Sequence, residues 1–304
     1  MIPIRFIVLL CSVLAMSSCR PKQEQVPTAD TPKLSLGQWT YHTALFAGEM
    51  STLDFIDRAH ELGFQGVDFV NQFFKDKASD RPFLDSLVAR LNAKSIQPVM
   101  IMVDGEGDLG STDSTARILA VQQHLQWIDA ASYVKAPYVR VNAHGDGTPT
   151  TMKSACVQSL RELNAYAQSR KVTILVENHG SYSSDGDWME DLLRQLAGSG
   201  IYALADFDNW CIERENGKLW GAPCIKRYDA LKGMKQLLPY AKGLSVKSFT
   251  FDSHGEETTI DYAGLISAAK ESGFSGYYGI EYEGEEHSPD EGVKLTLALV
   301  NKYY

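Results

Sequence analysis

Basic residues and cysteines are both scarce in this sequence of 304 residues. It has 29 lysines and arginines against 38 aspartates and glutamates, a formal net charge of −9, and only five cysteines. Nucleic-acid binding depends on neutralising phosphates, so this charge balance argues against a nucleic-acid partner. No glycine-rich phosphate loop follows any predicted strand, which leaves a nucleotide-binding fold with little support.

The N-terminal residues 1–18 predict a lipoprotein signal peptide. Arg5 is their only charge, and the apolar run from Phe6 to Leu14 is too short to span a bilayer. Small residues then precede Cys19, in a pattern that resembles the lipobox of bacterial lipoproteins, where that cysteine is acylated. We therefore expect an exported protein anchored to a membrane through lipid on Cys19. An ordinary signal peptide with an incidental Cys19 is the alternative.

Residues 19–33 are polar and proline-rich, which predicts a flexible tether. No basic amphipathic helix follows, so we expect membrane contact through the lipid alone. Of the cysteines that remain after export, Cys211 and Cys224 bracket one loop-like stretch. They could form a disulfide in an oxidising compartment or stay unpaired, and Cys156 reads as a buried thiol in a helix.

Residues 34–304 repeat a unit of short apolar strand, polar loop and amphipathic helix. Several strands are nearly continuous apolar runs, as expected where both faces of a parallel sheet are covered. The predicted strands are Leu34–Tyr41, Gly66–Val70, Pro98–Asp104, Tyr138–Ala143, Val172–Glu177, Tyr202–Phe207, Gly243–Ser248 and Gly276–Tyr282. The predicted later helices are Thr115–Val134, Thr151–Ser169, Asp187–Leu196, Arg227–Leu238, Asp261–Ser272 and Pro289–Tyr303.

Eight such units predict a single-domain (β/α)8 TIM barrel, an α/β fold, rather than a doubly wound sheet. Two connections are long, 104–113 after the third strand and 208–226 after the sixth. Both follow the carboxyl ends of strands, where such barrels place their active sites.

Polar residues follow all eight predicted strands. One such residue is often only a cap, but polar groups at every strand end predict a shared pocket, since burial of unpaired charge is costly. Trp188 and Trp210, like Trp39, could present flat surfaces to a ligand or could simply pack. The side chains expected to contact a substrate are Trp39, His42, Asn71, Glu106, Arg140, Asn142 and Asn178.

Three carboxylates, Glu177, Asp206 and Glu281, each end an apolar strand. They cannot share a small pocket at neutral pH unless protons or a cation compensate their charge. Hard oxygen ligands favour Mg²⁺ or Mn²⁺, and an added imidazole would admit Co²⁺ or Zn²⁺. The alternative is that each carboxylate pairs with a base such as Arg140 or Lys247.

Three histidines, His42, His144 and His179, follow strands and can reach the same end of the barrel. For each, a role as general acid or base and a structural hydrogen-bonding role both stay open. Lys247 lies in the seventh predicted strand, where its charge could stabilise a developing oxyanion.

The motifs at the strand ends resemble those of the sugar phosphate isomerase/epimerase family, the xylose-isomerase-like TIM barrels. The branch they resemble is common among exported bacterial proteins, and the similarity covers nearly the whole chain after Cys19. It is carried by QWTYHTALFAG (38–48), VDFVNQFFKDK (67–77), MVDGEGDLG (102–110), RVNAH (140–144), VENHG (176–180), DFDNW (206–210), VKSFTFD (246–252) and GIEYEG (279–284).

This resemblance implies a divalent metal held by Glu177, Asp206 and Glu281. Many relatives add a histidine from strand seven, but here Ser245 and Phe249 stand at the two positions where it would fall. Water, substrate or His179 could complete the shell, or metal binding could be weak or absent. For moving a proton between carbons, Glu177 and Glu281 could act as bases on opposite sides of the substrate. His144 or His179 is the alternative base, and Lys247 or Arg140 could support the developing oxyanion.

The expected reaction is metal-dependent sugar isomerisation or epimerisation, by proton abstraction next to a carbonyl. An exported enzyme meets free sugars and glycosides, so we expect an unphosphorylated sugar or keto-sugar as substrate. A lyase or hydratase acting on 3-keto-glycosides by β-elimination is the first alternative. A non-catalytic, lipid-anchored sugar-binding protein is the second. A metal-dependent nuclease barrel would need more histidine ligands and a basic groove, and neither is present.

Overall fold

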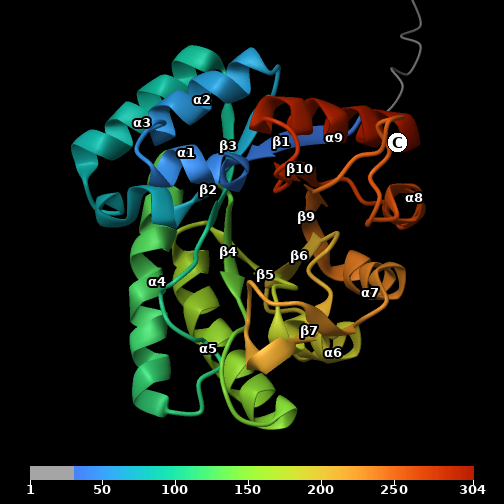
Figure 1. The fold of residues 1–304 in the computed structure, drawn as a ribbon. Helices are drawn as coiled ribbons and strands as arrows, with labels where there is room; N and C mark the ends of the chain where they lie inside the picture. The colour runs from blue at the N-terminus through green and yellow to red at the C-terminus, as the bar shows by residue number, and fades with distance from the viewer. Residues whose placement is uncertain (1–30) are drawn as a thin grey trace, which may run out of the picture. The chain divides into compact units, whose positions relative to one another are not determined.

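The computed structural model describes residues 31–304, which form a closed barrel of eight parallel strands surrounded by helices (Figure 1). The barrel order is β1-β10-β9-β6-β5-β4-β3-β2, so the predicted single (β/α)8 barrel is confirmed. The signal peptide and Cys19 lie outside the described residues. The barrel strands are β1 (Lys33–Gly37), β2 (Gly66–Val70), β3 (Gln97–Met102), β4 (Tyr138–Asn142), β5 (Thr173–Glu177), β6 (Tyr202–Asp206), β9 (Ala241–Ser248) and β10 (Tyr277–Tyr282).

The apolar runs of these strands are buried on both faces. Along β3, Met100 and Met102 belong to one cluster of buried side chains, and Ile101 and Val103 belong to another. Successive side chains of a strand point to opposite faces, so one cluster fills the barrel and the other joins the sheet to the helices. This double burial explains why the strands lack the alternation of a half-exposed sheet.

The helices that follow the strands are fixed at their first turns by side-chain caps. Each of α2 to α9 begins after a serine, threonine or aspartate whose side chain accepts a backbone N–H of the first turn. The predicted capping box at Ser51 and Asp54 is confirmed. The helices are α1 (His42–Phe46), α2 (Thr52–Glu61), α3 (Arg81–Lys94), α4 (Ser114–Val134), α5 (Pro149–Ser169), α6 (Gly186–Gln195), α7 (Ala230–Leu237), α8 (Tyr262–Glu271) and α9 (Pro289–Tyr303).

Two of the predicted boundaries are wrong by three residues or more, and the others lie within two residues of the structure. The first strand ends at Gly37 rather than at Tyr41, because the chain turns there into a 3-10 helix. The buried Gln38 side chain stabilises this turn by accepting the backbone N–H of Val70 at 2.9 Å. The helix predicted from Arg227 begins only at Ala230, since Arg227 belongs to a strand of the preceding loop.

The remaining short elements are 3-10 helices in the connections between strands and helices. They are the 3-10 helices η1 (Gln38–Tyr41), η2 (Asn71–Lys77), η3 (Ser181–Ser184), η4 (Glu215–Gly217) and η5 (Leu238–Tyr240). Among the residues that the structure describes, no helix has both the length and the apolar character needed to cross a membrane.

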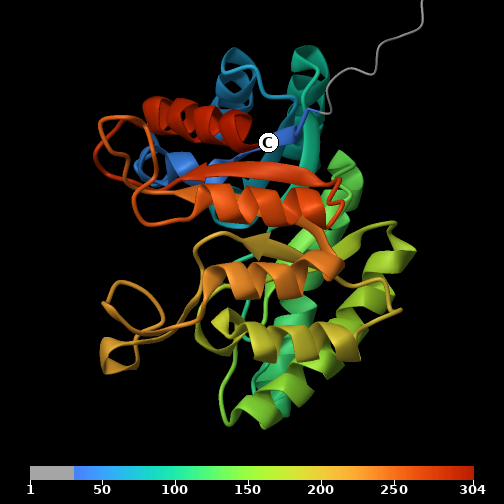
Figure 2. The same ribbon diagram turned by 90° about the vertical axis from the view of Figure 1, so that its right-hand side faces the viewer.

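The long connection after β6 is a disulfide-bonded hairpin. Its strands, β7 (Cys211–Arg214) and β8 (Cys224–Arg227), are antiparallel, and a disulfide joins Cys211 to Cys224 with their Cα atoms 5.9 Å apart. Figure 2 shows this gold segment reaching out from one end of the barrel. Of the two possibilities left open by the sequence, the disulfide is the one the structure contains.

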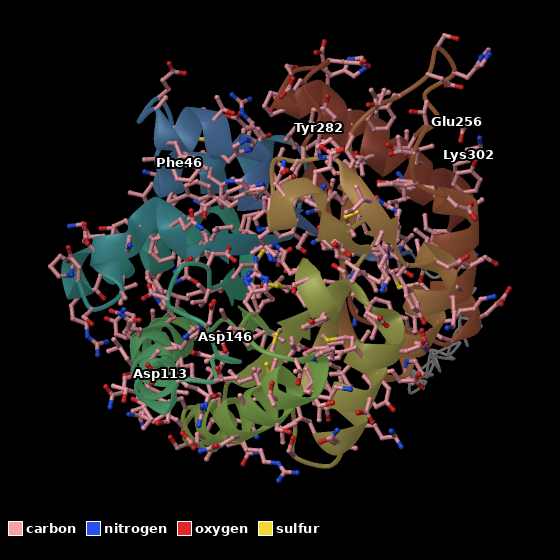
Figure 3. The ribbon with its side chains drawn as sticks, turned by 60° about the horizontal axis from the view of Figure 1, so that its bottom comes forward. Phe46, Asp113, Asp146, Glu256, Tyr282 and Lys302 are labelled. Carbon is pink, nitrogen blue, oxygen red and sulfur yellow. A yellow bond between two sulfur atoms is a disulfide. The ribbon has the colours of Figure 1, made fainter. Side chains whose placement is uncertain are left out.

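The loop after β9 is tied to the last helix. Glu256 of that loop pairs with Lys302 of α9, and the Tyr303 hydroxyl donates to Glu256 Oε2 at 2.7 Å. Figure 3 shows Glu256 and Lys302 side by side. The contact is exposed, so it orders the loop more than it stabilises the fold.

A buried carboxyl on β2 carries a cost for the fold. Asp68 is fully buried, and its Oδ2 accepts the Ser35 hydroxyl at 2.6 Å while its Oδ1 has no hydrogen-bond partner. Burial raises the pKa of Asp68 to about 7, against a smaller lowering effect of Ser35. Between its unfolded value of 3.8 and about 7, the folded state therefore binds more protons than the unfolded state.

The free energy of unfolding should consequently fall as pH rises through this window, by up to about 1.4 kcal/mol per pH unit from Asp68 alone. Asp68→Asn cannot titrate, so we expect it to remove the part of this decrease that Asp68 causes. The free energy of unfolding of the variant should therefore rise relative to that of the wild type towards pH 8. Urea unfolding from pH 4.5 to 8 measures this. Glu49→Gln, at an exposed position, is the matched control. Parallel pH profiles for Asp68→Asn and wild type would contradict the expectation.

Candidate active site

A cavity of about 560 Å³ opens at the carboxyl ends of the barrel strands. Every barrel strand, or the segment that follows it, contributes to its lining, as the strand-end pattern in the sequence predicts. The contributing side chains, in chain order, include Trp39, Gln72, Asp104, Arg140, Glu177, Asp208, Lys247 and Glu281. The hairpin after β6 adds Arg214, Leu219 and Trp220 to the wall.

Arg140 of β4 forms the first charged centre of the cavity. Its guanidinium donates from Nη1 to Asp104 Oδ1 at 2.6 Å, and its Nε lies 2.8 Å from Glu177 Oε2. Asn142 also donates to Asp104 Oδ1, at 2.7 Å. Burial alone would raise the pKa of Asp104, but Arg140 and the neighbouring polar groups outweigh it and hold that pKa below its usual range. Asp104 is therefore an anion fixed against a buried arginine.

Lys247 of β9 forms the second charged centre. Its Nζ lies 2.7 Å from Glu283 Oε1, 3.3 Å from Glu281 Oε1 and 3.7 Å from Asp206 Oδ2. Burial would lower the pKa of Lys247, but Asp206, Glu283 and Glu281 together raise it well above its usual value. The lysine therefore stays an ammonium ion and serves three carboxylates at once.

The carboxylates outnumber these cations. Glu177 and Glu281 are 3% and 6% exposed, and burial raises the pKa of both. For Glu177, burial outweighs Arg140 and brings the pKa to about 8. For Glu281, burial outweighs Lys247, and Glu283 raises the pKa further. Glu177 is therefore poised to hold or to release a proton near neutral pH, and Glu281 holds its proton more strongly than an ordinary carboxyl group does.

A divalent cation would fit the excess of negative charge at Glu177, Asp206 and Glu281. Asp206 is fully buried and its Oδ1 accepts the backbone N–H groups of Asp208 and Asn209, but its Oδ2 has no hydrogen-bond partner. This oxygen accepts no hydrogen bond from the described residues and has only the Lys247 ammonium at 3.7 Å, so together with Glu177 and Glu281 it could serve as a donor to a hard ion. Within residues 31–304, no group of three or more such ligands already stands at metal-binding spacing. Lys247, which lies between Asp206 and Glu281, is the cation that a metal ion would meet there.

Two of the predicted histidines, His144 and His179, line the cavity. His144 Nε2 lies 2.6 Å from the backbone oxygen of His179, and the rings stack with centroids 5.6 Å apart. Burial and the nearby Arg140 lower the pKa of His179 well below its usual value, so this ring is neutral. Its buried Nδ1 has no hydrogen-bond partner among the described residues. His42 instead stacks on Trp39 behind the cavity wall, with its Nδ1 2.9 Å from the Trp39 backbone oxygen.

Three residues expected to contact substrate turn away from the cavity. Asn71 and Asn178 each clamp the backbone of an acid on the next strand or loop. Asn71 accepts the N–H of Asp104 at 2.9 Å and donates to its carbonyl at 3.0 Å, and Asn178 does the same for Asp206 at 2.8 and 3.1 Å. Glu106 accepts the indole N–H of the buried Trp127 at 2.9 Å. These side chains position the acids from behind.

Of the tryptophans, the structure brings one predicted and one unpredicted residue to the cavity. Trp39 lines it, whereas Trp188 and Trp210 are buried and donate their indole N–H groups to backbone oxygens. Trp220, on the hairpin, also lines the cavity. The sequence signal that could have found it is the Cys211–Cys224 pair, which folds the intervening residues back over the barrel.

Residues 56–303 match the family model described as xylose isomerase-like TIM barrel, and the chain belongs to this family. Comparison with curated proteins finds no match. Solved structures share the fold at low identity. A D-psicose 3-epimerase from Clostridium cellulolyticum H10 is 14% identical over 89% of this chain and 99% of its own, with a TM-score of 0.65.

Two further structures are similar. A 3-keto-D-glucoside 4-epimerase from E. coli is 13% identical over 90% of this chain and 100% of its own, with a TM-score of 0.61. A xylose isomerase-like TIM barrel protein from Mycobacterium smegmatis, solved in complex with magnesium, is 14% identical over 90% and 98%, with a TM-score of 0.62. At these identities the likeness establishes the fold.

Removing the charge of Lys247 should expose its competition with a metal ion. In metal-free buffer we expect Lys247→Met to lower the free energy of unfolding by about 3–5 kcal/mol, because the buried carboxylates lose their partner. Millimolar Mn²⁺ should then stabilise the variant more than the wild type, since a ligand that binds only the folded state raises its stability.

Urea unfolding with EDTA and with MnCl₂ measures both effects. Lys153→Met is the matched control, because Lys153 pairs with Asp191 on the outer helices at 2.8 Å. Equal stabilisation of all three proteins by Mn²⁺ would count against a metal site at these carboxylates.

Proposed function

We propose that this protein is a sugar isomerase or epimerase that moves a proton at a carbon next to a carbonyl. The observation that carries the proposal is the placement of Glu177 and Glu281. They enter one cavity from β5 and β10, both with a raised pKa, and the cations Arg140 and Lys247 lie beside them. Proton transfer between carbons needs a base, an acid and positive charge near the carbonyl oxygen, and this cavity holds all three.

The two glutamates are the proposed proton carriers. One carboxylate takes the proton from the carbon, and the other returns a proton from its own side of the substrate. A raised pKa suits this exchange, because efficient general acids and bases titrate near the working pH. The neutral ring of His179, with its free Nδ1, is the alternative base. Arg140 and Lys247 stabilise the negative charge that develops on the sugar oxygens.

We further propose that Glu177, Asp206 and Glu281 bind a divalent metal ion. When bound, such an ion would polarise the substrate carbonyl as a Lewis acid. The unpartnered Asp206 Oδ2 supports this assignment. On β9, the seventh strand of the barrel, no histidine stands where many relatives have a ligand. The ligand set is therefore rich in oxygen, which favours Mg²⁺ or Mn²⁺ over Zn²⁺.

The proposed substrate is an unphosphorylated sugar or keto-sugar. Three basic side chains line the cavity, and each is already engaged. Arg140 and Lys247 pair with carboxylates, and Arg214 donates to the carbonyls of Leu219 and Ala222 within the hairpin. No cation of the described lining is thus left to hold a phosphate. The similar epimerases named above are, by their names, enzymes of psicose and of keto-glucosides.

The proposed location is outside the cytoplasm, on a membrane through lipid on Cys19. The disulfide between Cys211 and Cys224 supports export, because disulfides persist in oxidising compartments. An exported enzyme would act on sugars and glycosides before their uptake.

Proton exchange in D₂O tests the reaction. With D-psicose, D-tagatose or a 3-keto-D-glucoside as substrate, we expect NMR to show deuterium entering next to the carbonyl while the carbon skeleton is retained. Glu177→Gln and Glu281→Gln should each slow exchange by about 10²–10⁴-fold, the usual contribution of general acid–base catalysis. Glu285→Gln, at an exposed position on the loop after β10, is the matched control.

Other outcomes of this experiment separate the alternatives. Release of the aglycone, or a change in hydration, would assign the protein as a lyase or hydratase acting by β-elimination from the same carbanion. Sugar binding without exchange for any substrate would identify a non-catalytic binding protein. Much faster turnover of sugar phosphates would overturn the assignment of an unphosphorylated substrate.

A further inference from the structure

The hairpin after β6 adds exposed apolar side chains to the wall of the cavity. The barrel lines the cavity with charged and amide side chains such as Glu177, Lys247 and Asn142, and also with the apolar side chains of Trp39, Val70, Met102 and Phe249. The hairpin adds Leu219 and Trp220 beside Arg214. Leu219 and Trp220 are 38% and 41% exposed, whereas most large apolar side chains among the described residues are buried. An exposed apolar surface beside a polar cavity marks a place where a ligand is bound.

The hairpin holds Trp220 in a defined position. The disulfide closes its base, and at its tip Arg214 donates to the backbone oxygens of Leu219 and Ala222 at 3.2 and 2.9 Å. The Arg214 guanidinium also lies 5.5 Å from the Trp220 ring centroid. The indole is thus braced from within the hairpin before any ligand arrives, and pre-ordering of this kind lowers the cost of binding.

The tip also packs onto the barrel beside the reactive groups. The Trp220 ring lies 4.7 Å from the His179 ring, centroid to centroid. Gly180 follows His179 with φ +86°, and a Cβ there would lie 2.9 Å from Leu219 and 3.2 Å from Trp220. The missing side chain at position 180 therefore makes room for the hairpin tip, which places the indole at the edge of the proposed sugar site.

The geometry points to a second subsite, formed by Trp220 and Leu219, that binds a ring with an apolar face attached to the reacting sugar through its glycosidic oxygen. The substrate class would then be a glycoside rather than a free monosaccharide. A cavity of about 560 Å³ supports this, because clefts of about 300–1,000 Å³ hold drug-sized ligands. Indole faces stack well on apolar ring faces, whether of an aryl aglycone or of a second sugar. This inference rests on the proposed function, since it takes the charged and amide side chains of the barrel as the site of the reacting sugar.

Binding of unreactive glycosides tests the subsite separately from the reaction. Methyl and phenyl β-D-glucopyranoside have no carbonyl and cannot undergo the proposed proton transfer, so their dissociation constants can be measured by NMR titration of the full chain. We expect the wild type to bind the phenyl glycoside about five- to tenfold more tightly, as one aromatic stack provides. Trp220→Ala should remove this preference, and Trp220→Phe should keep most of it.

The matched control is Ile225→Ala, because Ile225 is a 58% exposed residue of the same hairpin that does not line the cavity. It should leave the preference for phenyl unchanged, and thermal melting checks that each variant is folded. Methyl β-cellobioside, which has no reducing end, distinguishes the source of the ring when it replaces the phenyl glycoside. A gain over methyl glucoside that depends on Trp220 identifies a second sugar, and a gain for phenyl alone identifies an aryl group.

Equal affinity of the wild type for phenyl and methyl glycosides would overturn the subsite, as would a preference that survives Trp220→Ala or no binding of any glycoside. The failure of the proposed reaction has a different signature. It would appear as missing proton exchange with keto-sugars while the preference for phenyl persists.

Discussion

The neutralisation of buried carboxylates governs the active end of this barrel. Asp104, Glu177, Asp206, Glu281 and Glu283 reach one region, and within residues 31–304 the cations paired with them are Arg140 and Lys247. Charges removed from water cost several kcal/mol each unless they are paired, so the remaining charge must be offset by protons or by a bound cation. A protein that keeps such an arrangement gives up stability for a site whose charge state can change during a reaction.

The barrel makes this arrangement possible because parallel strands deliver their last residues to one place. Lys247 of β9 is in register with Glu281 of β10. Arg140 of β4 lies two residues before the register partner of Glu177 on β5, and its side chain reaches that glutamate. The cations thus come from strands that adjoin those of the acids. Rigid strands hold these distances more precisely than loops would, and the loops are left to shape the walls.

The sequence predicted the barrel and most of its strand ends because double burial leaves apolar runs that stop where the polar residues begin. It placed Glu177, Asp206 and Glu281 at strand ends for that reason. It could not tell which strand-end side chains enter the cavity: Asn71 and Asn178 have the same sequence signature as Asn142, and only the register of the neighbouring strand turns them towards a backbone. The strands of the hairpin were not predicted, because β8 is exposed throughout and has no apolar periodicity.

The two asparagine clamps have a consequence for how this site can diversify. The amide of Asn71 binds the main-chain N–H and C=O of Asp104, and the amide of Asn178 binds those of Asp206. These hydrogen bonds do not involve the side chains of the two aspartates. The clamp would hold any residue with a backbone N–H at positions 104 and 206, because it does not contact the side chain there. The backbone position of the functional group is therefore set separately from its chemistry, although the Asp206 carboxylate also accepts the backbone N–H groups of Asp208 and Asn209. In such a scaffold, the backbone geometry of the site can be conserved while the side chains that perform the chemistry change.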